Sequence, residues 1–324
     1  MRAAVCRAYG PPSSVVVEAD WPAPDLGPDQ VRVAVRAAAV NFPDVLIVAD
    51  QYQLHVPPPF VPGSELAGTV TEVGAGVAGV SVGDRVFGTA MVGAFAEEIV
   101  LAASSVTPTP AGVDDAHAAA FGVAHRTAYH VLRSVAAVQP GEEVVVLGAG
   151  GGVGLAAVQL AVALGARVTA VASSPATREA AAAMGAAVVL DHTAGDLRAA
   201  LKAALPGGSD VVVDPVGGDL AEPALRSLRW AGRFVTVGYA SGTIPRIPLN
   251  LVLLKGIHVV GFQFLTFATN APDDLARDEA ELLALLAAGR ATPHIGARFP
   301  LDHAPAAMQH VADGRAVGKV VLEV

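Results

Sequence analysis

Cysteine is almost absent from the sequence, because Cys6 is the single one among 324 residues. One thiol excludes a disulfide within the chain, and it fits a reducing, cytoplasmic setting. Charged residues are also scarce, at 16 %, while hydrophobic residues make up 53 %. A chain with this composition is expected to fold around a large core and not to be disordered.

Basic residues are outnumbered by acidic ones, 21 against 30, which leaves a formal net charge of −9. An acidic surface repels phosphate backbones, so nucleic-acid binding is not expected. Long apolar runs are missing as well. The most apolar stretch, residues 154–172, is interrupted by Gln159 and Arg167 and therefore does not resemble a membrane span. We expect a soluble protein with no membrane partner.

The first 120 or so residues are predicted to be β-rich. Short runs of strand-forming residues are separated by turn residues, as in a small barrel, at 31–35, 68–74, 83–88 and 94–101. After about residue 121, apolar strands alternate with helices. Strands that are apolar on both faces indicate a parallel sheet covered by helices.

The end of the chain has a different pattern. It predicts an amphipathic helix at 275–288, a second helix at 300–311 and a last strand at 319–324. We interpret this tail as returning to the first domain. The expected organisation is one domain from residues 1–121 and 266–324, and a dinucleotide-binding domain from 122–265. The expected fold class is α/β, a doubly wound parallel sheet domain beside a β-barrel domain.

A glycine-rich turn lies between the strand at 143–147 and an apolar helix from Val153. Strand, glycine turn and helix follow in the order that a dinucleotide fold requires. The turn places the helix N-terminus against a pyrophosphate, and its free N–H groups favour the anion. The best register is Ala149-x-Gly151-x-x-Gly154, with Ala where the common fingerprint has Gly. A merely structural turn is the alternative.

The end of the second predicted strand bears on which nicotinamide cofactor is bound. NAD sites usually carry an acidic residue there that holds the ribose 2′-hydroxyl. This strand instead ends with Ser173 and Ser174, and Arg178 follows. A guanidinium pairs with a 2′-phosphate, so NADPH is favoured. The alternative is that Arg178 is a solvated helix residue.

Motifs along nearly the whole chain resemble the medium-chain dehydrogenase/reductase superfamily, within it the zinc-free quinone oxidoreductase (zeta-crystallin-like) branch. The segments that carry the resemblance are Val40–Leu46, Pro62–Gly68, Val82–Val86, Thr127–His130, Gly151–Leu155, Asp214–Gly218 and Gly318–Val321. The resemblance implies a GroES-like domain split between the two chain ends, around a Rossmann domain, with NADPH in the cleft between them. It also implies a homodimer through the Rossmann sheet edge, at 253–262.

The resemblance further implies roles for individual residues. Asn41, Asp44 and Tyr52 would line the catalytic side, where Asn41 hydrogen-bonds the nicotinamide ribose or an acceptor oxygen. Tyr52 would stack on a flat acceptor or donate a proton, with packing at the barrel rim as its alternative. For Asp44, a structural role is favoured over a catalytic one. Cofactor contacts would come from Asn41, Thr127, Gly151, Gly152, Val153, Ser173, Ser174, Arg178, His192, Val216, Gly238, Tyr239, Phe262, Phe264 and Lys319.

Several of these implied contacts are more specific. Thr127 would lie near the nicotinamide end, and Phe262 and Phe264 would flank the nicotinamide, unless they form an aromatic pair in the core or the dimer seam. Lys319 would reach the cofactor phosphates. His192 stands where the family often has Tyr against the adenosine.

Zinc is not expected. By resemblance, Asn41 and Ser64 occupy the places of the Cys and His ligands of the superfamily's alcohol dehydrogenases, and neither an amide nor a hydroxyl replaces them. Without a Lewis acid, reduction of a quinone is easier than reduction of a ketone. The product of quinone reduction resembles a phenolate, whose conjugate acid has a pKa near 10. The product of ketone reduction is an alkoxide, whose conjugate acid has a pKa of about 15.7.

The leading hypothesis is therefore an NADPH-dependent oxidoreductase that transfers hydride to a quinone or a related electron-poor acceptor without zinc. An NADPH-dependent enoyl-thioester or enone reductase is the nearest alternative. A non-enzymatic NADPH-binding protein is an alternative of another class, and a zinc alcohol dehydrogenase is the weakest one.

Overall fold

The computed structural model describes all 324 residues and divides into two compact units. The first contains residues 1–123 and 295–324, and the second contains residues 124–294. The return to the first unit thus lies at residue 295 and not at residue 266, as the sequence had indicated. The reason is that helix α10 (Pro272–Ala287) packs against α3 (Ala124–His130), so the whole segment from 266 to 294 stays with the second unit.

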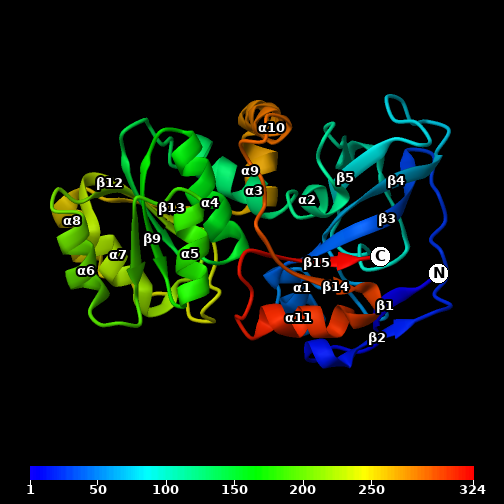
Figure 1. Cartoon of the computed structure of the whole chain (residues 1–324), viewed down its shortest axis with the longest axis horizontal. Coiled ribbons are helices and arrows are strands. Elements are labelled where there is room, and N and C mark those ends of the chain that lie inside the picture. The colour runs from blue at the N-terminus through cyan, green and yellow to red at the C-terminus, as the bar shows by residue number, and fades with distance from the viewer. The chain divides into compact units, whose positions relative to one another are not determined.

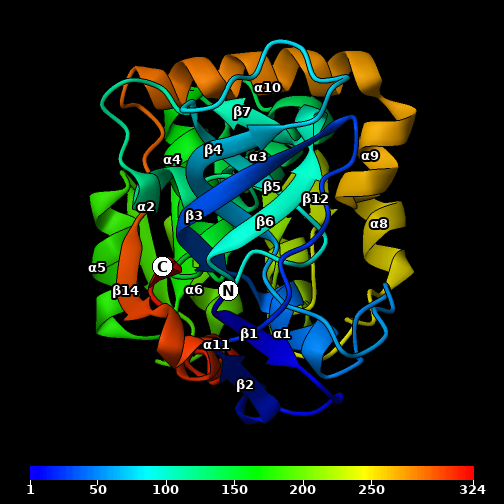
Figure 2. The same ribbon diagram turned by 90° about the vertical axis from the view of Figure 1, so that its right-hand side faces the viewer.

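The first unit is built on a seven-stranded, largely antiparallel sheet in the order β14-β15-β3-β4-β5-β7, with β6 also paired to β3. Figure 2 shows β3 with β4 and β6 beside it. A separate two-stranded sheet joins β1 and β2. The strands are β1 (Ala3–Cys6), β2 (Val15–Glu18), β3 (Gln30–Val40), β4 (Glu65–Val73), β5 (Arg85–Thr89), β6 (Glu98–Ala102), β7 (Val106–Pro108), β14 (Ile295–Pro300) and β15 (Lys319–Glu323).

Three α-helices complete this unit: α1 (Phe42–Val48), α2 (Asp115–Ala119) and α11 (Ala304–Ala312). Short 3₁₀ turns lie at Pro12–Ser14, Ala103–Ser105 and Leu301–His303. The core is an apolar cluster in which Val31, Val33 and Val35 alternate inward along β3. The helix predicted at 300–311 begins only at Ala304, because the strand β14 occupies 295–300.

The second unit is a doubly wound sheet of six parallel strands in the order β10-β9-β8-β11-β12-β13. Figure 1 shows α4 and α5 on one side of this sheet and α6 and α7 on the other. The strands are β8 (Glu143–Leu147), β9 (Arg167–Ala172), β10 (Val188–Asp191), β11 (Ser209–Asp214), β12 (Leu228–Thr236) and β13 (His258–Gly261). The predicted fold class is confirmed.

The helices of the second unit are α3, a π-helical turn at Val131–Val135, α4 (Gly152–Ala163), α5 (Pro175–Ala183), α6 (Leu197–Ala204), a 3₁₀ turn at Gly218–Leu220, α7 (Ala221–Ser227), α8 (Leu249–Lys255), α9 (Phe264–Asn270) and α10. Sequence patterns did not predict α8 and α9 as helices. None of the helices combines the length and the apolar character that crossing a bilayer requires.

Candidate cofactor and catalytic sites

The glycine turn after β8 has the geometry that a dinucleotide cradle requires. Gly148 adopts a positive φ of 57°, which favours glycine. A β-carbon at Gly154 would overlap the carbonyl oxygen of Gly148, so glycine is required there for α4 to pack against the turn. At Gly151, by contrast, a β-carbon would meet only the Gly148 carbonyl oxygen, at 3.6 Å, which leaves the surface of the turn open.

The N-terminus of α4 has the properties of an anion site. Its N-cap is Gly151, which offers no side-chain acceptor, so no side chain caps the first N–H groups of this twelve-residue helix. Gly151, Gly152 and Val153 are all partly exposed. Free N–H groups and the positive end of a helix dipole suit a pyrophosphate, and the residues therefore fit a dinucleotide cofactor.

Two further loops meet at the same edge of the sheet, after β11 and β12. The buried carboxylate of Asp214 accepts the N–H groups of Val216, at 2.9 Å, and Gly217, at 2.8 Å. The N–H of Ser241 then donates to the carbonyl oxygen of Val216 at 3.0 Å, which fastens the two loops together. Val216, Gly238 and Tyr239, which the resemblance implies as cofactor contacts, thus lie on two loops at one edge of the sheet.

The ends of β9 and β10 carry the residues expected to hold the adenosine part. The N–H of His192 donates to the carbonyl oxygen of Ala172 at 3.2 Å, so His192 lies beside Ser173. The hydroxyl of Ser174 caps α5 by accepting the N–H of Thr177 at 3.2 Å. Ser174 is therefore used by the helix cap, while Ser173 is exposed.

Arg178 is not a freely solvated side chain. Its Nη1 forms an ion pair with Asp191 at the end of β10, and it donates to the carbonyl oxygen of Ser173 at 2.9 Å. An acidic residue is thus present at this edge after all. It comes from the third strand along the chain and not from the second, which is why the sequence pattern missed it.

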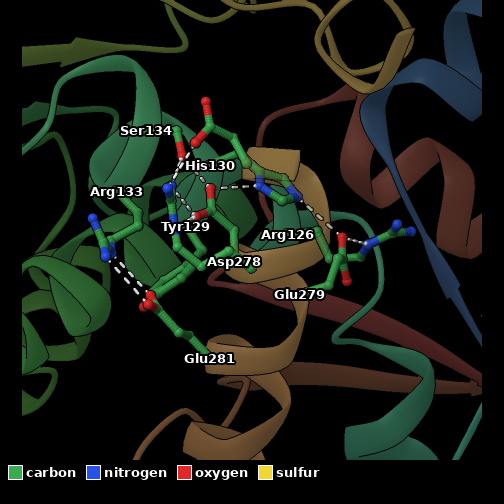
Figure 3. A network of polar contacts seen from close by, with 10 residues as sticks. Arg126, Tyr129, His130, Arg133, Ser134, Asp278, Glu279 and Glu281 are labelled. Carbon is green, nitrogen blue, oxygen red and sulfur yellow. Dashed lines mark hydrogen bonds and ion pairs between the residues drawn. The ribbon is translucent and has the colours of Figure 1, made fainter. Parts of the chain in front are cut away.

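A buried polar network joins α3 to α10, and Figure 3 shows it from close by. Both ring nitrogens of His130, which is fully buried, face carboxylates at 3.0 Å: Nδ1 faces Asp278 and Nε2 faces Glu279. The pKa of Glu279 is lowered, because hydrogen bonds and charges from His130 and Arg126 outweigh the upward effect of burial. This network holds α10 on α3, the helix that carries Thr127.

The aromatic residues expected beside the nicotinamide pack around His130. The ring of Phe262 lies 6.3 Å from the imidazole, centroid to centroid, and that of Phe264 lies 5.7 Å away. Phe267 is closer still, at 5.0 Å. Phe262 is buried and Phe264 only partly so, and their two rings lie 6.5 Å apart, centroid to centroid.

In the first unit, Asn41, Glu65 and Lys319 form a buried cluster. The ammonium of Lys319 donates to Asn41 Oδ1 at 2.5 Å and to Glu65 Oε1 at 2.6 Å. Asn41 Nδ2 donates to the same Glu65 oxygen at 2.9 Å and to Ser64 Oγ at 3.2 Å. Lys319 was expected to reach cofactor phosphates, but its ammonium is held inside this cluster and the residue is only 3 % exposed.

The same contacts change the interpretation of Asn41. Lys319 holds its amide oxygen, and both of its amide hydrogens have acceptors in Glu65 and Ser64. Asn41 is also the N-cap of α1, and its N–H donates to Asp44 Oδ2 at 2.7 Å. Within this unit, Asn41 organises the cluster and has no spare donor for a ligand.

Asp44 has one oxygen that the helix cap does not use. Its Oδ1 is buried and has no hydrogen-bond partner. Burial raises the pKa of Asp44 to about 7, although the N–H of Asn41 and the charge of Lys319 act in the opposite direction. The hydroxyl of Ser64 also lowers this pKa, but burial outweighs it, and the buried carboxyl group favours the protonated form.

We expect the Asp44→Asn variant to gain stability relative to the wild type as the pH rises. The folded-state pKa of Asp44 lies above its model value of 3.8, so its contribution is fully present below pH 3.8 and is lost as the pH rises towards about 7. Asn does not titrate. The difference in unfolding free energy should move in favour of the variant by on the order of 4 kcal/mol between pH 4 and pH 8. Denaturant unfolding at several pH values measures it, and a constant difference contradicts the expectation.

Tyr52 lies in the loop between α1 and β4 and is half-buried. It packs against the apolar core of the first unit. Burial raises the pKa of its phenol, and the charge of Asp44 acts in the same direction. Tyr52 and Asp44 thus lie near each other, and the phenol keeps its proton at neutral pH.

The residues that resemblance places at the catalytic metal do not fit zinc. Asn41 and Ser64 offer an amide and a hydroxyl, and the ammonium of Lys319 already lies against Asn41. Nowhere in the structure do three or more His, Cys, Asp or Glu side chains gather in a way that could hold a metal ion.

Comparison with known proteins adds a family. The family model "Alcohol dehydrogenase GroES-like domain" matches residues 27–111, and "Zinc-binding dehydrogenase" matches residues 152–285. Quinone oxidoreductase-like protein 2 of Bos taurus is 38 % identical and aligns over 99 % of this chain and 92 % of its own length. The spectinabilin polyketide synthase system protein NorB of Streptomyces orinoci is 40 % identical over 92 % of this chain, which spans only 13 % of NorB.

The solved structures agree with these relatives. Escherichia coli quinone oxidoreductase complexed with NADPH superimposes with a TM-score of 0.90 at 28 % identity. The match covers 100 % of this chain and 100 % of that one. Both units and nearly the full length of the chain are accounted for by the matches. The chain therefore belongs to the medium-chain dehydrogenase/reductase superfamily, in its quinone oxidoreductase branch.

Proposed function

We propose that the protein is an NADPH-dependent oxidoreductase that transfers hydride to a quinone or a related electron-poor acceptor without a zinc ion. The observation that carries this proposal is the uncapped N-terminus of α4 behind an open glycine turn, which fits the cofactor pyrophosphate. The relative solved with NADPH supports the choice of cofactor.

The cluster around Lys319 supports the absence of zinc. A metal ion would have to displace the ammonium from between Asn41 and Glu65. Reducing a quinone leaves a phenolate-like oxygen, whose acid has a pKa near 10, about six units below that of a simple alcohol. That difference is at most about 8 kcal/mol of stabilisation that no metal needs to supply.

The chain's own residues would bind, orient and supply a proton. NADPH, when bound, provides the hydride. We assign the pyrophosphate to Gly151, Gly152 and Val153, while Ser173, Arg178 and His192 hold the adenosine side. Val216, Gly238, Tyr239 and Thr127 contact the remainder of the cofactor.

On the acceptor side, we propose that Tyr52 stacks on a flat substrate or donates the proton that the reduced acceptor takes up. Burial raises the pKa of Tyr52, so the phenol is protonated at neutral pH and has a proton to offer to the reduced acceptor. Asp44 and Asn41 position this part of the unit, because Asp44 completes the cap of the helix that precedes the Tyr52 loop.

Turnover against a panel of acceptors tests the proposal. With simple quinones as acceptors, we expect NADPH to be oxidised faster than NADH. We expect the rate to be unaffected by an added metal chelator. Tyr52→Phe keeps the ring and should lower kcat by about 10²-fold if the phenol donates the proton. Stoichiometric zinc in the active protein, or no turnover of any quinone, would overturn the proposal.

An enoyl-thioester or enone reductase is the second candidate, and the similarity to a polyketide synthase system protein favours it. Rapid oxidation of NADPH by a crotonyl-type thioester, with none by quinones, would select this alternative. Tight NADPH binding with no turnover of quinones, enones or thioesters would instead indicate a non-enzymatic binding protein.

We also propose a cytoplasmic homodimer. Strand β13 ends the six-stranded sheet, and Val259 on it is 43 % exposed, while Leu253 on the neighbouring α8 is 81 % exposed. An unpaired apolar strand edge invites a second strand. Sedimentation should give a dimer that Val259→Lys converts to a monomer, and a wild-type monomer would refute it.

A further inference from the structure

The carboxylate of Asp191 lies beside the end of β9, the second strand of the Rossmann sheet along the chain. Strand β10 pairs in parallel with β9, and Asp191 is opposite Ala172, the last residue of β9. The end of the second strand of a Rossmann sheet is where the ribose 2′ position of a dinucleotide is bound. The acidic residue that β9 lacks is therefore supplied from its neighbour.

Asp191 is held as an ionised carboxylate. Its Oδ1 accepts the N–H of Thr193 at 2.8 Å and the hydroxyl of Thr193 at 2.6 Å. These hydrogen bonds, together with the charge of Arg178, lower the pKa of Asp191. The carboxylate therefore carries its negative charge throughout the neutral pH range.

Arg178 is only partly committed to Asp191. Nη1 bonds Asp191 and the carbonyl oxygen of Ser173, whereas Nε and Nη2 make no hydrogen bond in the structure. The side chains of Arg178 and Asp191 are 28 % and 25 % exposed, so a ligand can reach the pair. A guanidinium has five donors, and the unused ones suit a phosphate.

The two halves of this pair favour different ligands. Arg178 attracts a 2′-phosphate, but Asp191 neutralises its charge and repels the same phosphate. An ionised carboxylate also accepts a hydrogen bond from an unphosphorylated 2′-hydroxyl, as in NAD sites. We propose that Asp191 is a specificity-determining residue that limits the preference for NADPH over NADH by neutralising Arg178. This inference rests on the proposed binding of a nicotinamide dinucleotide at this edge of the sheet.

Calorimetric titration with NADPH and with NADH, without any acceptor, tests it. Asp191→Asn keeps an oxygen that accepts from Thr193 but removes the charge. We expect the ratio of the NADH Kd to the NADPH Kd to rise about tenfold in this variant, and Arg178→Gln to lower the ratio. Asp196→Asn is the matched control, because this substitution removes the same charge elsewhere. Asp196 caps α6 by accepting the N–H of Arg198 at 2.9 Å.

The outcomes separate the two proposals. A raised ratio in Asp191→Asn with an unchanged ratio in Asp196→Asn supports the role of Asp191. An unchanged ratio in Asp191→Asn, or an equal rise in both variants, overturns it while leaving the proposed function intact. Wild-type protein that binds neither dinucleotide overturns the proposed function and this inference together. Thermal unfolding of each variant checks that it is folded.

Discussion

Replacing Gly154 with alanine is expected to unfold the second unit or to destabilise it by about 3 kcal/mol or more. A β-carbon at this position would overlap the carbonyl oxygen of Gly148 and approach Ala149 Cα at 2.8 Å. Both obstacles are backbone atoms, so no side chain can rotate away. Either the glycine turn or the first turn of α4 would have to move, and NADPH binding should be lost with the cradle. Thermal unfolding and calorimetry measure the two effects.

Gly151→Ala is the control for this prediction. Gly151 has a φ of −84°, which alanine adopts, and its β-carbon would meet only an oxygen at 3.6 Å. We expect this variant to stay folded, with a cost of about 1 kcal/mol because alanine is a poor N-cap. The added methyl group would project from the open surface of the turn and weaken NADPH binding about tenfold. If the Tm of Gly154→Ala equals that of the wild type, the close approach of Gly154 to the backbone of Gly148 and Ala149 is not essential.

Replacing Lys319 with methionine is expected to destabilise the protein by about 3–5 kcal/mol. Glu65 is fully buried, and the substitution would leave its carboxylate without a counter-charge. The remaining donors to Glu65, Asn41 Nδ2 and the N–H of Val123 at 2.7 Å, are neutral. They compensate only part of the cost of a buried charge. Chemical denaturation at pH 7 measures the loss.

A second substitution separates charge from packing in this prediction. The double variant Lys319→Met with Glu65→Gln buries no net charge and should recover much of the lost stability. Lys202→Met, an exposed lysine on α6, should change stability by less than about 0.5 kcal/mol. A Lys319→Met protein as stable as the wild type would mean that Glu65 takes up a proton at little cost.

The fold and the cofactor cradle could be predicted because their signals are local. Glycines between a strand and a helix determine the turn at 148–154, and alternating strands and helices determine the sheet. The second domain boundary could not be found in the same way. The sequence of α10 shows an amphipathic helix, but only its contacts show that it packs on α3.

The partners of charged side chains were the least predictable part of the site. Arg178 was predicted to bind a 2′-phosphate, but its pairing with Asp191 depends on the neighbouring strand that brings that carboxylate alongside. Lys319 and Glu65 are 254 residues apart in the sequence. His130 and Asp278 are likewise brought together only by helix packing. No short-range pattern contains such information, although a charged residue inside an apolar stripe, such as Asp278 on α10, signals a buried partner.

The discontinuity of the first unit affects how the protein must be made. Strand β15, which supplies Lys319 and pairs with β3, is synthesised after β1 to β14. Until then, a nascent chain carries Glu65 without the ammonium of Lys319, and β3 lacks the partner of its last residues, Ala37–Val40, whereas residues 124–294 are already complete. The continuous unit can therefore fold during translation, while the discontinuous one must wait, exposed to chaperones and proteases, for the last strand.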